Sequence, residues 1–333
     1  MGTRNLKSAY RTKTVSLFMD VEDPINPLAD DAALDFPLLF ADAGVRGSFC
    51  LTGEKCRTLQ ARGRLDVAEA YKPHCLGLHT NTHSFHPSTM ELLAGLQWAE
   101  GCVAAYETES KGFNAFVNLI GRPPSFWGGG GNTWSPEITD AMKRLQIPAY
   151  VYALTRFPDE AVHMFNGVIA LPQALSISEQ DWADDDRAAT ASDRVLHSIA
   201  ELDQPWIGVF VGHPTKFRHT DWWDIPYYGG RTPPAPEYGT PVSQETYRRA
   251  KSNLRSFLDR IKREFEVIGV DEALQLPWQF RLPTADELAY YEEHTPATVR
   301  GAKNWPIHYP GLDPELIVAK TMALTNTVQV GTI

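Results

Sequence analysis

The sequence predicts an α/β fold, a parallel (β/α) barrel. Short apolar runs alternate with longer segments of helical periodicity, which is typical of β/α layering. Seven or eight such units fall within about 270 residues, which favours a parallel barrel over an open sheet. The expected strands are 14–19, 46–51, 75–80, 125–128, 149–153, 168–171, 206–212 and 265–270.

Helical patterns occupy the intervals between these strands. The clearest is SPEITDAMKRLQ, where Ser135 is a favoured N-cap residue and Pro136 suits the first helical position. A long, charged amphipathic helix is expected after the last loop. The expected helices are 29–43, 90–119, 136–145, 192–202 and 243–264.

Two segments depart from this rhythm. Residues 216–241 are rich in aromatic residues, proline and glycine and show no period, so we expect a long functional loop. Its aromatic content favours an ordered lid, because disordered segments are poor in aromatic residues. Residues 277–333 are expected to be a C-terminal extension that packs on the barrel or at a subunit interface. The barrel domain is therefore predicted to span 12–276.

Composition narrows the classes of partner. The 333 residues are 43% hydrophobic with a formal net charge of −10, which disfavours nucleic acid and anionic membrane surfaces. Neither a signal peptide nor an apolar run of about 20 residues is visible, so a soluble cytoplasmic protein is expected. The cysteines match no zinc or redox spacing, and we expect them to be reduced. They are Cys50, Cys56, Cys75 and Cys102.

Polar, titratable or aromatic side chains flank several predicted strands. In β/α barrels the reactive groups collect on the face formed by the carboxyl ends of the strands. The residues concerned are Asp20, Glu22 and Asp23 after the first strand, His79 and His83 after the third, Arg122 and Trp127 around the fourth, and His213 after WIGVFVGHP.

His79 and His83 could share a metal ion only if the chain turns between them. In an extended chain they would lie about 13 Å apart, whereas one helical turn brings them to about 6 Å. The intervening Thr-Asn-Thr favours turning. Two imidazoles with a nearby carboxylate suit a divalent ion such as zinc. A purely structural turn with hydrogen-bonded histidines is the alternative, and a HExxH zinc site is excluded because Thr80 holds the glutamate position.

Four motifs, in this order, resemble those of the polysaccharide deacetylases (NodB-homology domain, carbohydrate esterase family 4). They are LFMDVED, HTNTH, GRPPSF and VFVGHP, and the resemblance covers about residues 14 to 275. It implies a distorted (β/α) barrel with about seven parallel strands, a divalent metal that is usually zinc, and hydrolysis of N- or O-acetyl groups on sugars. HTNTH in its context is the specific part of the match.

The resemblance also implies a role for each matching residue. His79 and His83 would be metal ligands, and Asp20 would be the general base that activates water. Arg122 would orient Asp20, and His213 would be the general acid that protonates the leaving group.

Three departures from the family pattern point to an atypical member. The usual adjacent aspartates are replaced by Asp20-Val21-Glu22-Asp23. Alternation along a strand places Asp20 and Glu22 on one side, so Glu22 is the expected carboxylate ligand with Asp23 as the reserve. The family's Asp-Trp motif near the fifth strand is missing, so His213 is expected to lack its usual partner. Gly212 directly precedes His213 in place of the commoner Leu-x-His.

Aromatic residues near these motifs are expected to contact substrate. They are Trp127, Trp222, Trp223 and Tyr227. For Trp127 a core position is equally expected, and the Trp222/Trp223 pair could instead cover the active site or a subunit contact. GGGGN at 128–132 is expected to allow close backbone approach, and 181–187 is expected to be a solvated loop.

Three functions are compatible with these residues. The first is a metal-dependent hydrolase, with zinc as cofactor, that removes an acyl group from an amine of a sugar or polysaccharide. The second is a C–N hydrolase of allantoinase type that acts on a small amide or ureide without metal. The third is a non-catalytic carbohydrate-binding relative. A carbohydrate or other small molecule is the expected partner, and the sequence leaves a homo-oligomer open.

Overall fold

A computed structural model describes residues 13–132, 135–152, 161–165, 167–202, 204, 206–276 and 279–281. Within them, seven parallel strands pair in the order β7-β5-β4-β3-β2-β1-β8, and a β7–β8 pairing closes the ring. The predicted barrel and its strand number are therefore confirmed. The ring strands are β1 (Thr14–Val21), β2 (Ser48–Leu51), β3 (Cys75–Leu78), β4 (Phe126–Gly128), β5 (Ala149–Tyr152), β7 (Val168–Ser176) and β8 (Trp206–Gly212).

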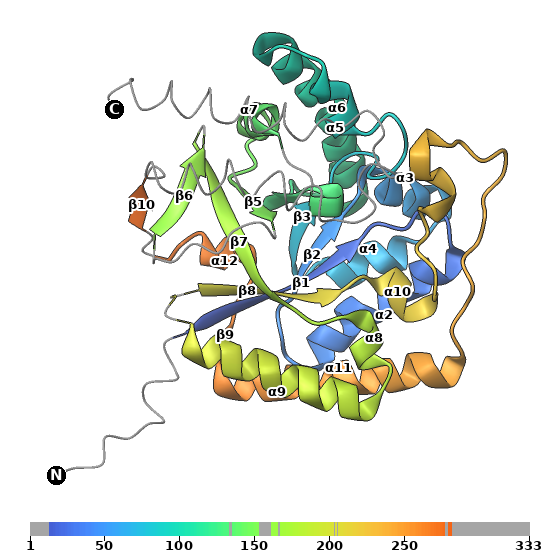
Figure 1. The fold of residues 1–333 in the computed structure, drawn as a ribbon, viewed down its shortest axis with the longest axis vertical. Coiled ribbons are helices and arrows are strands. Elements are labelled where there is room, and N and C mark those ends of the chain that lie inside the picture. Colours follow the sequence, from blue (N-terminus) through green and yellow to red (C-terminus); the bar gives the residue numbers. More distant parts are fainter. Residues whose placement is uncertain are drawn as a thin grey trace.

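Three further strands extend this sheet beyond the ring (Figure 1). β6 (Ala161–Phe165) pairs antiparallel with β7, and β10 (Gln279–Arg281) adds to β6. β9 (Glu266–Val267) pairs with the start of β1. The expected strand at 265–270 is thus much shorter, because α12 (Val270–Ala273) begins directly afterwards and Glu272 accepts the Gly269 N–H. Apart from β10, the predicted C-terminal extension lies outside the described residues.

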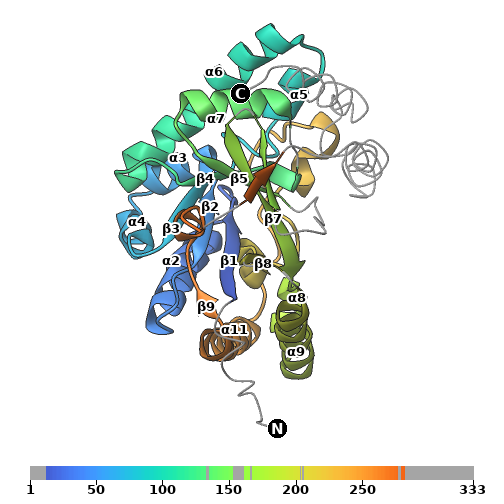
Figure 2. The same cartoon turned by 90° about the vertical axis from the view of Figure 1, so that its left-hand side faces the viewer.

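Helices surround the ring on its outer side (Figures 1 and 2). No helix of the described chain is long and apolar enough to cross a membrane. The remaining helices are α2 (Pro27–Asp42), α3 (Gly53–Ala61), α4 (Leu65–Tyr71), α5 (Thr89–Ala94), α6 (Trp98–Ile120), α7 (Pro136–Arg144), α8 (Glu179–Trp182), α9 (Asp185–Glu201), α10 (Pro214–Arg218) and α11 (Gln244–Glu264), with 3₁₀ turns η2 (Gly130–Asn132) and η3 (Ile225–Gly230).

Two predictions of local structure, a helix at 90–119 and a loop at 181–187, are corrected. The pattern at 90–119 divides into α5 and α6, because Gly95 ends the first helix and the extended Gln97 starts the second. The segment 181–187 is not a solvated loop. It ends α8 and begins α9, with Trp182 fully buried and its indole N–H donated to the Val211 carbonyl at 2.9 Å.

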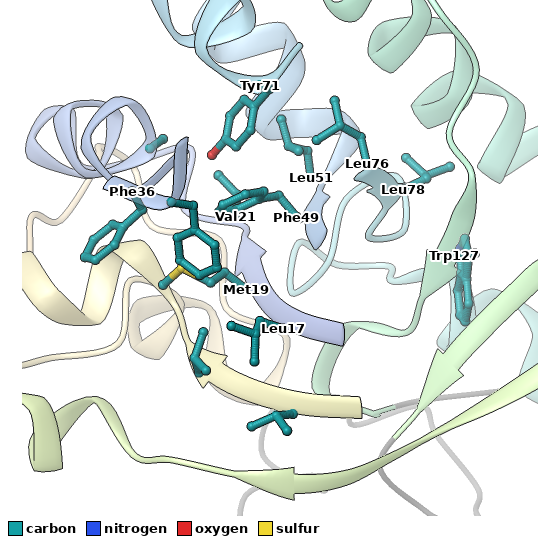
Figure 3. Close-up of a cluster of buried hydrophobic side chains, with 14 of the residues drawn as sticks. Leu17, Met19, Val21, Phe36, Phe49, Leu51, Tyr71, Leu76, Leu78 and Trp127 are labelled. Atoms are coloured by element: carbon teal, nitrogen blue, oxygen red, sulfur yellow. The ribbon is translucent and has the colours of Figure 1, made fainter. Parts of the chain in front are cut away.

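The alternation of side chains along β1 determines what reaches the barrel interior. Leu17, Met19 and Val21 face the helical layer and pack with Phe36 of α2 (Figure 3). Phe18 instead contacts Phe126 of β4 and Trp206 of β8, both edge to face. Because β4 is not a neighbour of β1 in the ring, this contact crosses the barrel interior. Continuing the alternation puts Asp20 and Glu22 on the same interior side, at the carboxyl end of the barrel.

Candidate metal and catalytic centre

Two parallel strands, β1 and β3, bring acidic and histidine side chains together at their carboxyl ends. Asp20 and Glu22 lie at the end of β1, and His79 and His83 lie in the turn after β3. The Glu22 carboxylate Oε2 lies 3.0 Å from His83 Nε2 and 3.4 Å from His79 Nε2. The two imidazole rings are 5.0 Å apart between centroids. These three residues form a buried group whose ligand atoms could hold one metal ion.

The turn that aims both histidines is built from its own backbone and from α3. Thr80 and His83 adopt left-handed φ angles of 57° and 52°, which is uncommon for residues other than glycine. The Thr80 hydroxyl accepts the His83 N–H at 3.0 Å, and the first N–H groups of α3 bind the carbonyls of Thr80 and Asn81. The chain therefore curls directly after His79 instead of continuing as a strand.

The hydrogen bonds of His79 leave the ring nitrogen that faces Glu22 available to a metal. His79 Nδ1 lies 3.1 Å from the Gly128 carbonyl, which can only accept, so Nδ1 carries the proton. His79 Nε2 is buried and makes no hydrogen bond within the described residues. This is the arrangement typical of a metal-binding histidine, whose other nitrogen donates to a backbone carbonyl. The residues present fit a divalent metal.

Close approach of the glycine segment after β4 completes the wall of this cluster. A Cβ on Gly130 would lie 2.6 Å from Cδ2 of His83, so a side chain there would displace the imidazole. This agrees with the expectation that GGGGN allows the backbone to come near the site.

Burial and neighbouring charges shift the pKa values of the ionisable side chains in this cluster. Burial raises the pKa of Glu22, but the charges of His83 and His213 and the close approach of the His79 and His83 imidazoles lower it more, to well below its ordinary value. Burial lowers the pKa of His79, yet Asp20, Cys50 and Glu22 raise it well above its ordinary value. Without a cation, extra protons on His79 and His213 would balance the negative charge of the carboxylates. A divalent cation can replace those protons.

His213 faces the same cluster from the end of β8. Its Nε2 lies 3.9 Å from Oδ2 of Asp20 and 3.9 Å from Oε2 of Glu22. On its other side, Nδ1 lies 2.6 Å from Oε1 of Glu179, which also accepts the His213 backbone N–H at 2.8 Å. Burial lowers the pKa of His213, but Glu22, Glu179 and Asp20 raise it to about 9.

Glu179 was missed by the sequence analysis: the family's usual Asp-Trp partner of His213 was expected to be absent, and Glu179 contacts this histidine. Glu179 is the first residue of α8, immediately after β7, and its approach requires Gly212. This glycine has a φ of 127°, and a Cβ there would lie 2.8 Å from Glu179 Cγ. The available signal was the acid in SISEQDW, directly after an N-cap serine and before a buried tryptophan.

Two predicted site residues lie outside the cluster. Arg122 donates to the His74 carbonyl at 2.6 Å, just before β3 begins, so it sits at the opposite end of the barrel from Asp20. Asp23 accepts the N–H groups of Ile25 and Asn26 within its local turn, and it also accepts the hydroxyl of Thr215 from α10. With both oxygens engaged, Asp23 is not the carboxylate that faces the histidines.

Of the aromatic residues expected to contact substrate, only Trp222 lies against His213 while remaining partly exposed. Its ring lies 4.8 Å from that of His213, nearly perpendicular. Trp127 is fully buried and donates its indole N–H to Glu109 at 3.0 Å, so it belongs to the core. Trp223 is also buried, and the ring of Tyr227 packs on Phe85 at 4.6 Å.

Trp223 nevertheless contributes to the centre, although not as a substrate contact. Its indole N–H donates to Oε1 of Glu22 at 3.0 Å. This leaves Oε2 of Glu22 facing the histidines.

Comparison with known proteins adds evidence about the fold. No family profile and no curated protein matches the chain. Among solved structures, a protein from Mycobacterium smegmatis described as a candidate polysaccharide deacetylase matches with a TM-score of 0.53 and 12% identity, over 82% of this chain and 94% of its own. A 4-alpha-glucanotransferase from Thermococcus litoralis matches with a TM-score of 0.54 and 12% identity, over 91% of this chain and 48% of its own.

A CE4 family pseudoenzyme from Bacillus anthracis also matches, at 11% identity and a TM-score of 0.42, over 80% of this chain and 66% of its own. At 12% identity, the two matches with TM-scores of 0.53 and 0.54 show the fold alone and leave the activity to be argued from the site. The chain therefore has the barrel fold found in polysaccharide deacetylases, as the motif resemblance implied.

Proposed function

We propose that this protein is a metal-dependent hydrolase, with zinc as the resident ion, that removes an acetyl or similar acyl group from an amine of a carbohydrate. The observation that carries the proposal is the buried Glu22–His79–His83 group. In it, His79 Nε2 makes no hydrogen bond to any described residue and lies 3.4 Å from a carboxylate oxygen of Glu22. Two neutral imidazoles and one carboxylate are a common ligand set for catalytic zinc.

Glu22, His79 and His83 would hold the ion, which when bound would polarise the acyl oxygen and lower the pKa of a nearby water. Asp20 is partly exposed beside them, with its Oδ2 3.8 Å from His79 Nε2. Asp20 takes the proton of the attacking water as the oxygen bonds to the acyl carbon.

His213 supplies the proton that the leaving amine needs. In the metal-free protein its pKa of about 9 keeps it mainly protonated near neutral pH, and Glu179, which is not a metal ligand, contributes to this value. Its Nε2 faces the cluster, while Nδ1 is held by Glu179. As the C–N bond breaks, Nε2–H donates to the amine nitrogen, so the products are a carboxylic acid and a free amine.

The experiment is acetate release by the zinc-loaded protein from N-acetylated chitin oligosaccharides and O-acetylated xylan, compared with small amides and ureides. We expect release from an acetylated sugar that stops on chelation and is lost in Asp20→Asn and His213→Ala. The matched control is Asp31→Asn, an exposed carboxylate in the first half of α2 that pairs with Arg64 at the surface.

Two results would contradict the proposal. Turnover of a ureide that persists without metal would favour the amidase. Sugar binding with no turnover in the metal-loaded protein would favour a non-catalytic relative.

A further inference from the structure

The aromatic-rich segment 216–241, called the aromatic loop below, approaches the candidate centre through three consecutive residues. They contact His213, Glu22 and, through Ser84, His83. The ring of Trp222 lies against His213, and the indole N–H of Trp223 donates to Glu22. Asp224 accepts the Ser84 hydroxyl through Oδ2 at 2.6 Å. Ser84 in turn lies 2.6 Å from Nδ1 of His83. A loop that only covered the barrel would have no need of these directed contacts.

The direction of the Asp224 chain follows from the chemistry of its members. An ionised carboxylate can only accept, so the single hydroxyl hydrogen of Ser84 goes to Asp224. The Ser84 oxygen must then accept from Nδ1–H of His83. The hydrogen bond to Ser84 selects the tautomer of neutral His83 whose Nε2 lone pair faces Glu22. The Asp224 carboxylate, linked to His83 through Ser84, makes Nε2 a stronger electron-pair donor to a metal.

Trp223 orients a second candidate metal ligand, the carboxylate of Glu22. Indole nitrogen is a donor only, and it occupies Oε1 of Glu22. Rotation of the carboxylate would break this bond, so Oε2 is kept toward the two histidines. The bonds are also sealed from water, since Ser84 and Trp223 are each 1% exposed and Asp224 is 3% exposed. Hydrogen bonds in such a dry setting resist exchange with solvent.

We propose that Trp223 and Asp224 are positioning residues that orient the candidate metal ligands Glu22 and His83, so that seating of the aromatic loop and metal binding are coupled. The inference rests on the proposed metal-dependent function. Coupling is reciprocal, so a loop that favours the metal must itself be stabilised by the metal.

The test is the affinity of the full chain for Co²⁺ and Zn²⁺, measured by competition with a chromophoric chelator. Trp223→Phe removes one N–H, and Ser84→Ala removes one hydroxyl. Asp224→Ala removes the carboxylate, and Asp224→Asn keeps an oxygen that can accept from Ser84. Outer partners of metal ligands typically contribute 10- to 100-fold in affinity. We expect losses of about tenfold or more in the first three variants and an intermediate loss in Asp224→Asn.

The matched control is Asp221→Asn, which lies in the same loop but is exposed and bonded to the Thr240 backbone. Its affinity should equal that of the wild type. Trp222→Phe should also leave the affinity unchanged, because Trp222 touches His213 and not a ligand. As a second readout, metal should slow proteolysis of the loop in the wild type and do so less in Asp224→Ala.

Two failures are distinguishable. If the wild type binds metal, and the folded Ser84→Ala, Trp223→Phe and Asp224→Ala proteins bind it within about twofold, the positioning role is refuted while the proposed function survives. If the wild type binds no metal, the proposed function fails and this inference fails with it. Circular dichroism of the metal-free proteins identifies variants that do not fold, and Ser84→Ala is the smallest change available should larger ones unfold.

Discussion

Replacing Glu179 with glutamine should lower the pKa of His213. The pKa of His213 rises from its ordinary 6.5 to about 9, against the effect of burial. At 1.36 kcal/mol per unit, this rise corresponds to roughly 3 kcal/mol in favour of the cation. Glu179 is one of two carboxylates that dominate the increase, and at 2.6 Å it makes the shortest contact. Its removal should therefore lower the pKa by about one unit or more.

The assay is a titration of the His213 imidazole by NMR in the metal-free protein. Asp181→Asn in the same short helix is the matched control and should leave the value near 9. For the proposed metal-dependent activity, the alkaline limb of kcat/KM should move to lower pH in Glu179→Gln. An unchanged His213 titration in Glu179→Gln would refute the reasoning, because no other described carboxylate contacts Nδ1.

The same shift predicts how stability depends on pH. A histidine whose pKa is raised by folding stabilises the folded state fully below about pH 6.5, and this contribution is lost as pH rises through about 9. The wild type should therefore exceed Glu179→Gln in unfolding free energy by about 1.5–3 kcal/mol near pH 6. The gap should narrow toward pH 9. A gap that widens with pH in urea unfolding of the metal-free proteins would contradict this sign.

Two further substitutions test the walls of the site. Gly130→Ala should weaken metal binding severalfold, because its Cβ would collide with the His83 imidazole. The control is Gly95→Ala, which has open space around it and should leave the affinity unchanged. Equal affinities of the two variants in chelator competition would contradict the close approach of Gly130 to His83. Trp127→Phe should cost about 1–3 kcal/mol in urea unfolding, since the buried carboxylate of Glu109 loses a donor. A raised KM with unchanged stability would instead restore Trp127 as a substrate contact.

The barrel could be predicted from the sequence because its signal is repetitive. Each buried strand is a short apolar run, and the helices between them carry their own caps, as Ser135 and Pro136 illustrate. The pairing of Asp20 with Glu22 on one face was also accessible, because alternation along a strand is a local property.

Contacts between segments that are distant in the sequence could not be predicted from local sequence patterns. Glu179 reaches His213 across 34 positions only because β7 and β8 are neighbours that close the ring, and no periodicity reveals ring closure. The placement of Trp223 against Glu22 depends on how the long loop folds back over the barrel. These two residues account for much of what the sequence analysis missed.

Two errors could have been avoided by simple topology. Arg122 precedes β4, so in a parallel barrel it belongs to the end opposite Asp20. Asp23 is followed by Pro24, Ile25 and Asn26, and an aspartate before such a sequence commonly binds the next backbone N–H groups. Its carboxylate was therefore committed to a turn that the sequence already indicated.

The central claim is that Glu22, His79 and His83 bind a divalent metal. The most direct measurement is the metal content of the purified protein by elemental analysis, beside the His79→Ala/His83→Ala double variant. The account predicts about one zinc or similar ion per chain in the wild type and almost none in the variant. No metal in either protein after incubation with zinc, cobalt and nickel, or equal metal in both, would contradict it.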